Sequence, residues 1–302
     1  MNGQNSQKSQ FRSNVETAVI VFVLGYGLHY IGYFIRARYF KLLEGLAVDE
    51  GIAHVLMYLG HVIFLAFLLL YALAVRKDRK YILSFARGGF GRNIRYALAG
   101  AVTGFVLMGI CVLSAASNGN LEIRPATAVS IPFFVFAALA VFIQATVEEI
   151  ESRAFVFGKT NDEGVPLVLA IVTSAFFFSY IHAANPGFGW LPLTSIFVLG
   201  VLLALCYYYF GTIWFCCTAH MMWNFTQDFV FGLPDSGKPA VVSLFKSTAN
   251  GSSFFYDETF GIEGSYMAIV VNILACVVVV VIGRYIRKRR NAEDTRSQNK
   301  LY

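Results

Sequence analysis

Three ionisable residues, Glu148, Glu149 and Arg153, lie in a stretch of the sequence that is apolar on both sides. If the stretch is a helix, Glu149 and Arg153 are four positions apart and face each other, which predicts a bidentate ion pair. Glu148 is turned about 100° away and has no such partner. Two adjacent acids in different environments can divide their roles, one structural and one free to act as a base. Glu151 fits a surface charge at a helix end.

Two further polar pairs lie in the next apolar stretches, again with helical spacing. Phe178 and His182 are four residues apart, so the phenyl ring can pack against the imidazole and fix it. His220 and Asn224 have the same spacing and present two polar groups side by side. Cys217, one turn before His220, could bind a metal, but a packing role is favoured. Either pair alone is typical of hydrogen bonding between membrane helices.

The composition indicates the solvent in which these groups lie. Of the 302 residues, 57% are hydrophobic and 14% are charged, and the mean hydropathy is +0.61. A soluble domain carries about 25% charged residues. The apolar residues form blocks near the length that crosses a ~30 Å hydrocarbon layer. They predict an all-α, polytopic membrane bundle of about eight transmembrane helices, near residues 15–35, 52–75, 95–116, 130–157, 165–183, 190–210, 212–231 and 264–283.

The charge of +6 is distributed as expected for an oriented membrane protein rather than a nucleic-acid-binding protein. Seventeen basic residues fall in the N-terminal segment, the loop near 76–94, Lys159 and the C-terminal tail, against six on the other side. The positive-inside rule then predicts a cell-membrane protein with both termini cytoplasmic. We expect one domain over residues 1–302, with a catalytic core at about 130–230. The loop 232–263 is interpreted as a lid or a connector.

In this order, the motifs resemble the CPBP family of intramembrane proteases (CAAX-processing and bacteriocin-processing), also called Abi or type II CAAX prenyl endopeptidases. The resemblance covers roughly residues 130–230. The family patterns Glu-Glu-x-x-x-Arg, Phe-x-x-x-His and His-x-x-x-Asn match Glu148, Glu149 and Arg153, then Phe178 and His182, then His220 and Asn224. One departure is Ala154, where many members have glycine, and it concerns packing rather than chemistry.

The resemblance implies an endopeptidase that hydrolyses a peptide bond of a membrane-associated or lipidated substrate. Glu148 with His182 would activate water, His220 and Asn224 would stabilise the oxyanion, and Glu149 with Arg153 would hold the geometry. Glu148, His182 and His220 also match the ligands of a catalytic zinc, so no cofactor is certain and a divalent metal is an alternative to glutamate-activated water. The expected partners are a peptide or membrane-protein substrate and the lipid bilayer, with no nucleic acid.

Two other classes of function remain open at this point. A transporter could use intramembrane Glu, His and Arg as a relay, but the repeated halves typical of transporters are absent from the sequence. A non-catalytic interaction or bacteriocin-immunity protein of the same family would tolerate the loss of motif residues. Straight-helix arithmetic gives a depth of about 15 Å for Glu148 and about 24 Å for His182. We nevertheless expect convergence on one water-filled cavity that opens toward the cytoplasm.

Overall fold

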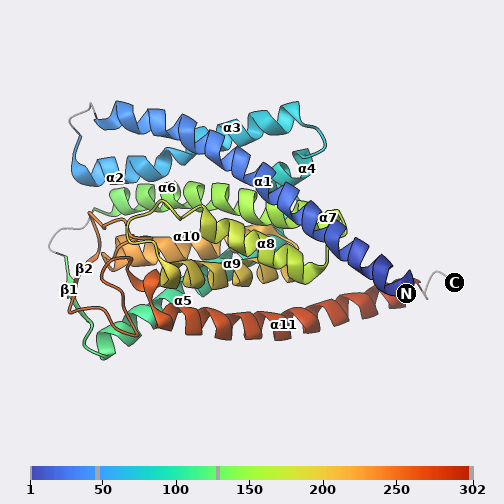
Figure 1. Cartoon of the computed structure of the whole chain (residues 1–302). Coiled ribbons are helices and arrows are strands. Elements are labelled where there is room, and N and C mark those ends of the chain that lie inside the picture. The colour runs from blue at the N-terminus through green and yellow to red at the C-terminus, as the bar shows by residue number, and fades with distance from the viewer. Residues whose placement is uncertain (1, 45–47, 127–129, 299–302) are drawn as a thin grey trace.

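The computed structural model describes residues 2–44, 48–126 and 130–298, and most of them are helical (Figure 1). The main helices are α1 (Asn2–Glu44), α2 (Glu50–Leu59), α3 (His61–Ala74), α5 (Phe90–Ser117), α6 (Ile131–Glu149), α8 (Leu167–Tyr180), α9 (Trp190–Phe210), α10 (Ile213–Phe225) and α11 (Tyr266–Gln298). The shorter elements are α4 (Arg79–Ile82), the 3₁₀ helices η1 (Leu83–Ala86) and η4 (Ile262–Gly264), and α7 (Gly158–Asp162). Each apolar block predicted from the sequence is therefore helical.

Six helices in the described part of the chain are long and apolar enough to cross a membrane. They confirm the all-α, polytopic membrane bundle. The count of eight spans is not confirmed, because α8 has 14 residues and α10 has 13. At 1.5 Å per residue these helices are only about 20 Å long, shorter than the ~30 Å hydrocarbon layer.

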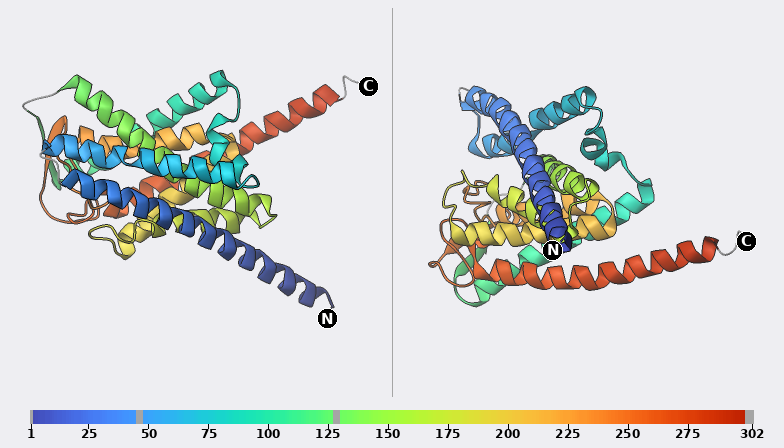
Figure 2. Two further views of the ribbon diagram at one scale, coloured as in Figure 1. Left: turned by 90° about the horizontal axis from the view of Figure 1, so that it is seen from above. Right: turned by 45° about the vertical axis from the view of Figure 1, so that its right-hand side comes forward.

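Both described chain ends lie at one end of the bundle, together with α4 of the basic loop (Figure 1). Figure 2 shows that α1 and α11 diverge there, so the two ends lie on opposite flanks. At the other end, β1 (Leu121–Pro125) pairs antiparallel with β2 (Phe245–Ala249), with Leu121 opposite Ala249. This small sheet was not predicted. It joins the loop 232–263 to the segment that follows α5.

Helix α10 is held in the centre by a close contact with α5. A Cβ atom at Gly100 would lie 2.3 Å from the carbonyl oxygen of Phe215, and one at Gly104 would lie 2.1 Å from that of Ala219. Only glycine permits this approach, which is the usual way that small residues let membrane helices pack closely. The contact fixes the turn of α10 that carries His220.

After Glu149, α6 continues as the π-helical segment η2 (Ile150–Phe157) and then as α7. A second π-helical segment, η3 (Thr226–Val230), extends α10. Short π-helical insertions are frequent at functional sites. Both segments border the motif residues: η2 follows Glu149, and η3 follows Asn224.

The structure corrects the interpretation of two charged residues. Glu151 is not a surface charge, because it is 2% exposed and its Oε2 lies 3.1 Å from Nδ1 of His29 on α1. Lys159 is not a free loop charge either, since its Nζ lies 2.5 Å from Oδ1 of the buried Asp78. The two pairs join η2 and α7, the segments that continue α6, to the N-terminal third of the chain, so these residues are structural.

Candidate active site

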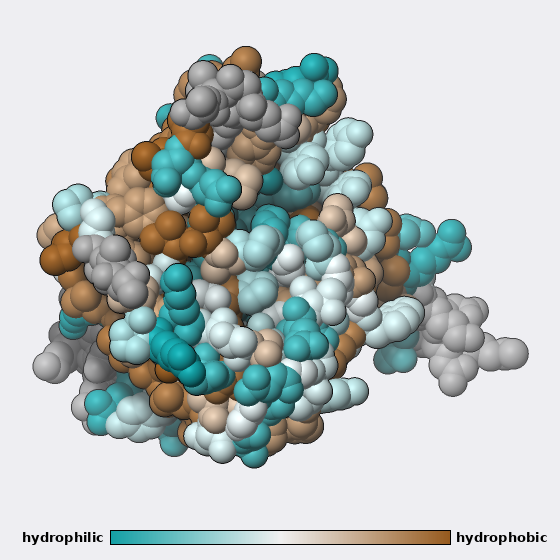
Figure 3. Space-filling view, turned by 90° about the vertical axis from the view of Figure 1, so that its left-hand side faces the viewer, coloured by the Kyte–Doolittle hydropathy of each residue, from teal (hydrophilic) through white to brown (hydrophobic). Residues whose placement is uncertain are grey.

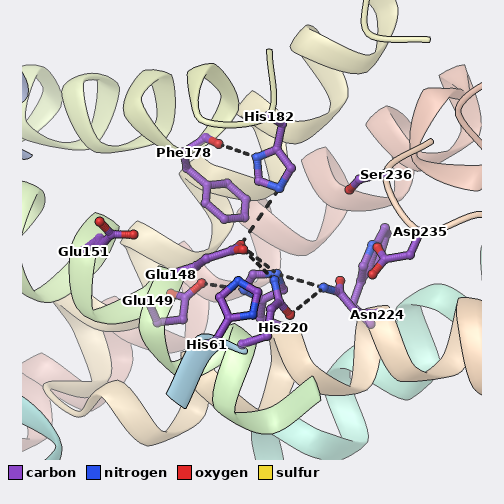
Figure 4. A network of polar contacts seen from close by, with 12 residues as sticks. His61, Glu148, Glu149, Glu151, Phe178, His182, His220, Asn224, Asp235 and Ser236 are labelled. Carbon is purple, nitrogen blue, oxygen red and sulfur yellow. Dashed lines mark hydrogen bonds and ion pairs between the residues drawn. The ribbon is translucent and has the colours of Figure 1, made fainter. Parts of the chain in front are cut away.

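Glu148 projects from α6 toward two imidazole rings, as Figure 4 shows. Its Oε2 lies 3.9 Å from Nε2 of His182 and 3.8 Å from Nε2 of His220. Its Oε1 accepts a hydrogen bond of 2.6 Å from the side-chain amide of Gln144, one helical turn earlier. Gln144 thus orients the carboxylate and leaves Oε2 toward the histidines. Within the described residues, Oε2 is buried and has no hydrogen-bond partner.

His182 reaches the site from the loop that follows α8. The expected difference in depth between His182 and Glu148 is absent because the α6 helix does not end near residue 157. It continues through η2 and α7 to Asp162. Glu148 therefore lies roughly 20 Å from that end, close to the depth calculated for His182 from the start of α8.

His220 lies between the two glutamates. Its Nδ1 is 3.0 Å from Oε1 of Glu149, while its Nε2 faces Glu148. Asn224 donates its amide to Oε1 of Gln144 (3.2 Å) and to Nε2 of His220 (3.3 Å). The structure therefore brings Glu148, Glu149, His220 and Asn224 together in one hydrogen-bonded group.

Arg153 is fully buried and lies beside Glu149, with Nε 3.1 Å from Oε2. The predicted bidentate geometry is not formed, because the two terminal guanidinium nitrogens have no hydrogen-bond partner among the described residues. The guanidinium carbon instead lies 4.1 Å from the centroid of the Phe178 ring. A cation over an aromatic face is attracted by the ring quadrupole. Phe178 thus contacts both Arg153 and His182.

The hydrogen bonds define which ring nitrogens carry hydrogen. Nδ1 of His182 lies 2.8 Å from the carbonyl oxygen of Phe178, and a carbonyl can only accept. Nδ1 of His220 faces the Glu149 carboxylate and donates to it in the same way. In both neutral rings Nε2 therefore carries the lone pair on the side of Glu148, and that of His220 already accepts from Asn224. A water molecule with two hydrogens satisfies the two remaining acceptors, Oε2 of Glu148 and Nε2 of His182.

A metal is the alternative occupant of the position between these acceptors. Zinc ligands at about 2.0–2.2 Å in a tetrahedral site lie roughly 3.3 Å apart. The observed separations of 3.9 and 3.8 Å are larger. Within residues 2–44, 48–126 and 130–298, no group of three or more His, Cys, Asp or Glu side chains is placed to hold a metal. Cys217 packs in the apolar core. These residues as arranged do not fit a bound zinc.

The site opens into a cavity of about 260 Å³. Several residues of its wall belong to none of the sequence motifs, namely Arg36, Tyr58, Gln144, Asp235, Ser236 and Lys238. Of these, only Gln144 has a signal in the sequence, because it precedes Glu148 by four residues. The others come from α1, α2 and the loop 232–263, which no motif connects to the site.

The loop 232–263, which supplies Asp235, Ser236 and Lys238 to the cavity wall, lies at the end of the bundle opposite the chain termini (Figure 1). Figure 3 looks onto that end and shows hydrophilic side chains gathered at its centre. The predicted cytoplasmic termini and the predicted opening of the cavity toward the cytoplasm therefore conflict in this fold. A cavity that opens at this end cannot face the cytoplasm if both termini are cytoplasmic.

Comparison with known proteins agrees with the motifs. Residues 130–226 match the family model described as Type II CAAX prenyl endopeptidase Rce1-like. The matched segment covers less than half of the 302 residues, from the start of α6 to the end of α10. It contains Glu148, Glu149, Arg153, His182, His220 and Asn224, and it confirms the resemblance predicted from them. No curated protein matches the chain.

Proposed function

We propose that this multi-pass membrane protein, which resembles the type II CAAX prenyl endopeptidases, is an intramembrane endopeptidase that uses glutamate-activated water. One observation carries the proposal. Among the described residues, the buried Oε2 of Glu148 has no hydrogen-bond partner, and it faces Nε2 of His182 and Nε2 of His220 at 3.8–3.9 Å inside a cavity. Such a set of acceptors binds a water molecule and can remove its proton. Intramembrane ionisable groups of this kind are functional by default.

In the proposed reaction, a water molecule lies between Glu148 and His182. Glu148 accepts the proton as the water oxygen attacks the scissile carbonyl, and His182 holds the water through its lone pair. The proton on Glu148 then passes to the leaving amine when the carbon–nitrogen bond breaks. The backbone carbonyl of Phe178 fixes the His182 tautomer throughout.

The developing oxyanion requires hydrogen-bond donors, and we assign this role to His220 and Asn224. His220 can donate from Nε2 when it is protonated, and the adjacent Glu149 carboxylate stabilises that charge. Both amide hydrogens of Asn224 are engaged with Gln144 and His220 in this structure. Protonation of His220 would remove its acceptor at Nε2 and release one amide hydrogen of Asn224 for the substrate oxygen.

The test of the proposal is a comparison of membrane peptides and protein termini between cells with the wild type and cells with Glu148→Ala. We expect new termini in the wild type that are absent in the variant. Glu163→Ala is the matched control, because it removes an exposed carboxylate just after α7, at the end of the same continuous helix. This variant should retain the wild-type pattern. Identical profiles for all three proteins would refute peptidase activity.

The same substrates allow a test of metal dependence. Cleavage by purified protein should survive dialysis against a chelator, because no step of the proposed reaction uses a metal. Loss of cleavage on dialysis, with recovery on addition of zinc, would establish the metal alternative at Glu148, His182 and His220.

We also propose that both termini are cytoplasmic, because the basic residues concentrate at the end of the bundle that holds them. Single cysteines at Gln10, Thr259 and Lys288, all exposed, should be labelled by an impermeant reagent in intact cells only at position 259. The wild type, with its own five cysteines, gives the background. Labelling at 10 and 288 alone would reverse the orientation and place the cavity on the cytoplasmic side.

A further inference from the structure

The cavity wall contains a tyrosine that joins two aspartates. The hydroxyl of Tyr58 on α2 lies 2.8 Å from Oδ2 of Asp228 in η3 and 2.5 Å from Oδ2 of Asp235 in the loop 232–263. All three side chains are buried, with 9%, 0% and 6% of their surface exposed. The proposed peptidase reaction uses none of them.

These two contacts cannot both be made with two ionised aspartates. A tyrosine hydroxyl has one hydrogen and can donate only once. With both carboxylates ionised, one of the contacts would join two oxygen atoms with no hydrogen between them. The geometry therefore requires one more proton, carried by a carboxyl group that donates to the oxygen of Tyr58.

The neighbouring contacts assign this proton to Asp235. Asp228 faces His54, whose Nε2 lies 2.7 Å from the same Oδ2 that accepts from Tyr58. Two donors directed at one oxygen indicate a carboxylate. At Asp235, Oδ1 accepts from the amide of Gln227 at 2.8 Å, which leaves Oδ2 to carry the hydrogen toward Tyr58.

The charges around Asp235 favour the same state. Burial and then the nearby carboxylates of Glu263 and Asp228 raise the pKa of Asp235 to about 7. Lys238 is the nearby cation, but it is exposed and its contact with Asp235 is made by the backbone. The other groups that face Asp235, from α2 and η3, are Tyr58 and Gln227, which are neutral.

The hydrogen bond from protonated Asp235 to Tyr58 connects the loop 232–263 to α2 in the cavity wall. Asp235, Ser236 and Lys238 all line the cavity, and the hydroxyl of Tyr58 is the side-chain link from Asp235 to α2. Ser236 is held separately, because its backbone amide and hydroxyl both donate to Oε2 of Glu263. Loss of the Asp235 proton would put a negative charge between Asp228 and Glu263 and break the contact with Tyr58.

We propose that protonated Asp235 is a pH-sensitive latch, which holds residues 233–238 against α2 over the cavity and releases them when it ionises. This inference does not depend on the proposed function, since its test uses stability and exchange rather than cleavage.

The sign of the pH dependence follows from the direction of the shift. An unfolded aspartate has a pKa near 3.9, so below this pH Asp235 is protonated in both states and has no effect. Between about 4 and 7 the folded protein binds more protons than the unfolded chain, so the contribution of Asp235 to stability falls as the pH rises. Above about pH 7 the loss is complete.

The first test compares the thermal unfolding of purified full-length protein and Asp235→Asn between pH 5 and 8.5. Asparagine imitates the protonated acid: its amide can donate to Tyr58 and its oxygen can accept from Gln227. The difference in Tm between the two proteins should be smallest at pH 5 and should grow as the pH rises to about 7. At pH 8 the variant should be the more stable, by roughly 5 °C. Asp257→Asn, which alters another carboxylate of the same loop, should follow the pH dependence of the wild type.

The second test measures release of the segment itself by hydrogen–deuterium exchange of residues 233–238. Its amides at Leu233, Asp235 and Gly237 are bonded to backbone carbonyls and should be protected while the latch is closed. The ratio of the wild-type exchange rate to that of Asp235→Asn should be several-fold higher at pH 8 than at pH 5.5. Comparing the wild type with the variant at the same pH cancels the intrinsic pH dependence of amide exchange.

Two results would overturn the latch. If Asp235→Asn and the wild type change in parallel at every pH, Asp235 does not carry the proton. If the variant is the less stable protein at pH 8, Asp235 acts as an ionised anchor.

Discussion

Glu148→Gln is expected to reduce peptide cleavage by about 10²–10⁴-fold, the contribution typical of a general base. The amide keeps the size of the side chain but cannot accept a proton from water. It should not harm the fold, because the amide oxygen can still accept from Gln144 and the amide nitrogen can donate to the Nε2 lone pair of His182. The measurements are kcat and KM on an identified substrate, with Tm recorded in detergent.

The variant Glu149→Gln, compared with Glu148→Gln, distinguishes the catalytic role assigned to Glu148 from the structural role assigned to Glu149. If Glu148→Gln stays active while Glu149→Gln is stable but inactive, the assigned roles are reversed. If both variants remain active, neither glutamate is the catalytic base and the proposed mechanism is wrong.

Glu149→Gln is expected to destabilise the protein by about 3–5 kcal/mol, the usual effect of removing one partner of a buried ion pair. Glu149 and Arg153 are both fully buried, and Glu149 also accepts from His220. Without the carboxylate, the contact that remains to the Arg153 guanidinium among the described residues is the face of the Phe178 ring. We expect low folded yield and a fall in Tm on the order of 10 °C.

The control for this prediction is the double variant Glu149→Gln/Arg153→Met, which removes the unpaired charge. It should be less destabilised than the sum of the two single variants, because the buried cation is gone. Additive losses, or a Glu149→Gln protein as stable as the wild type, would show that the pair does not hold the site.

The sequence was sufficient for the helices and for the motif residues. Apolar block lengths predict helices directly, and spacing of four residues identifies neighbours on one helix face. Glu149 and Arg153, Phe178 and His182, and His220 and Asn224 are all in contact as this rule predicts. Gln144 and Glu148 are also four residues apart, so the same spacing predicts their hydrogen bond once amide side chains are considered.

The sequence was insufficient wherever contacts join distant segments. Glu151 resembles a surface charge because nothing local indicates that His29 on α1 covers it. Tyr58 and Asp235 are 177 residues apart, and only the fold brings them to one cavity wall. The predicted depth of Glu148 was too small, because a π-helical segment and α7 extend α6 beyond its apolar stretch, where hydropathy gives no signal. Helix packing and backbone geometry decide these features.

The π-helical segment η2 has a consequence for which changes of chain length this protein can tolerate. A π turn holds more residues than the 3.6 of an α turn, so removal of a single residue between 150 and 157 would let an ordinary α-helix form. Residues beyond such a deletion would keep nearly their present direction, because the π turn already accommodates the extra residue, and Lys159 would still face Asp78. A deletion in α6 before Glu148 would instead turn Glu148 by about 100° relative to the start of the helix. The π-helical segment is therefore a part of this continuous helix in which the loss of one residue should preserve the site.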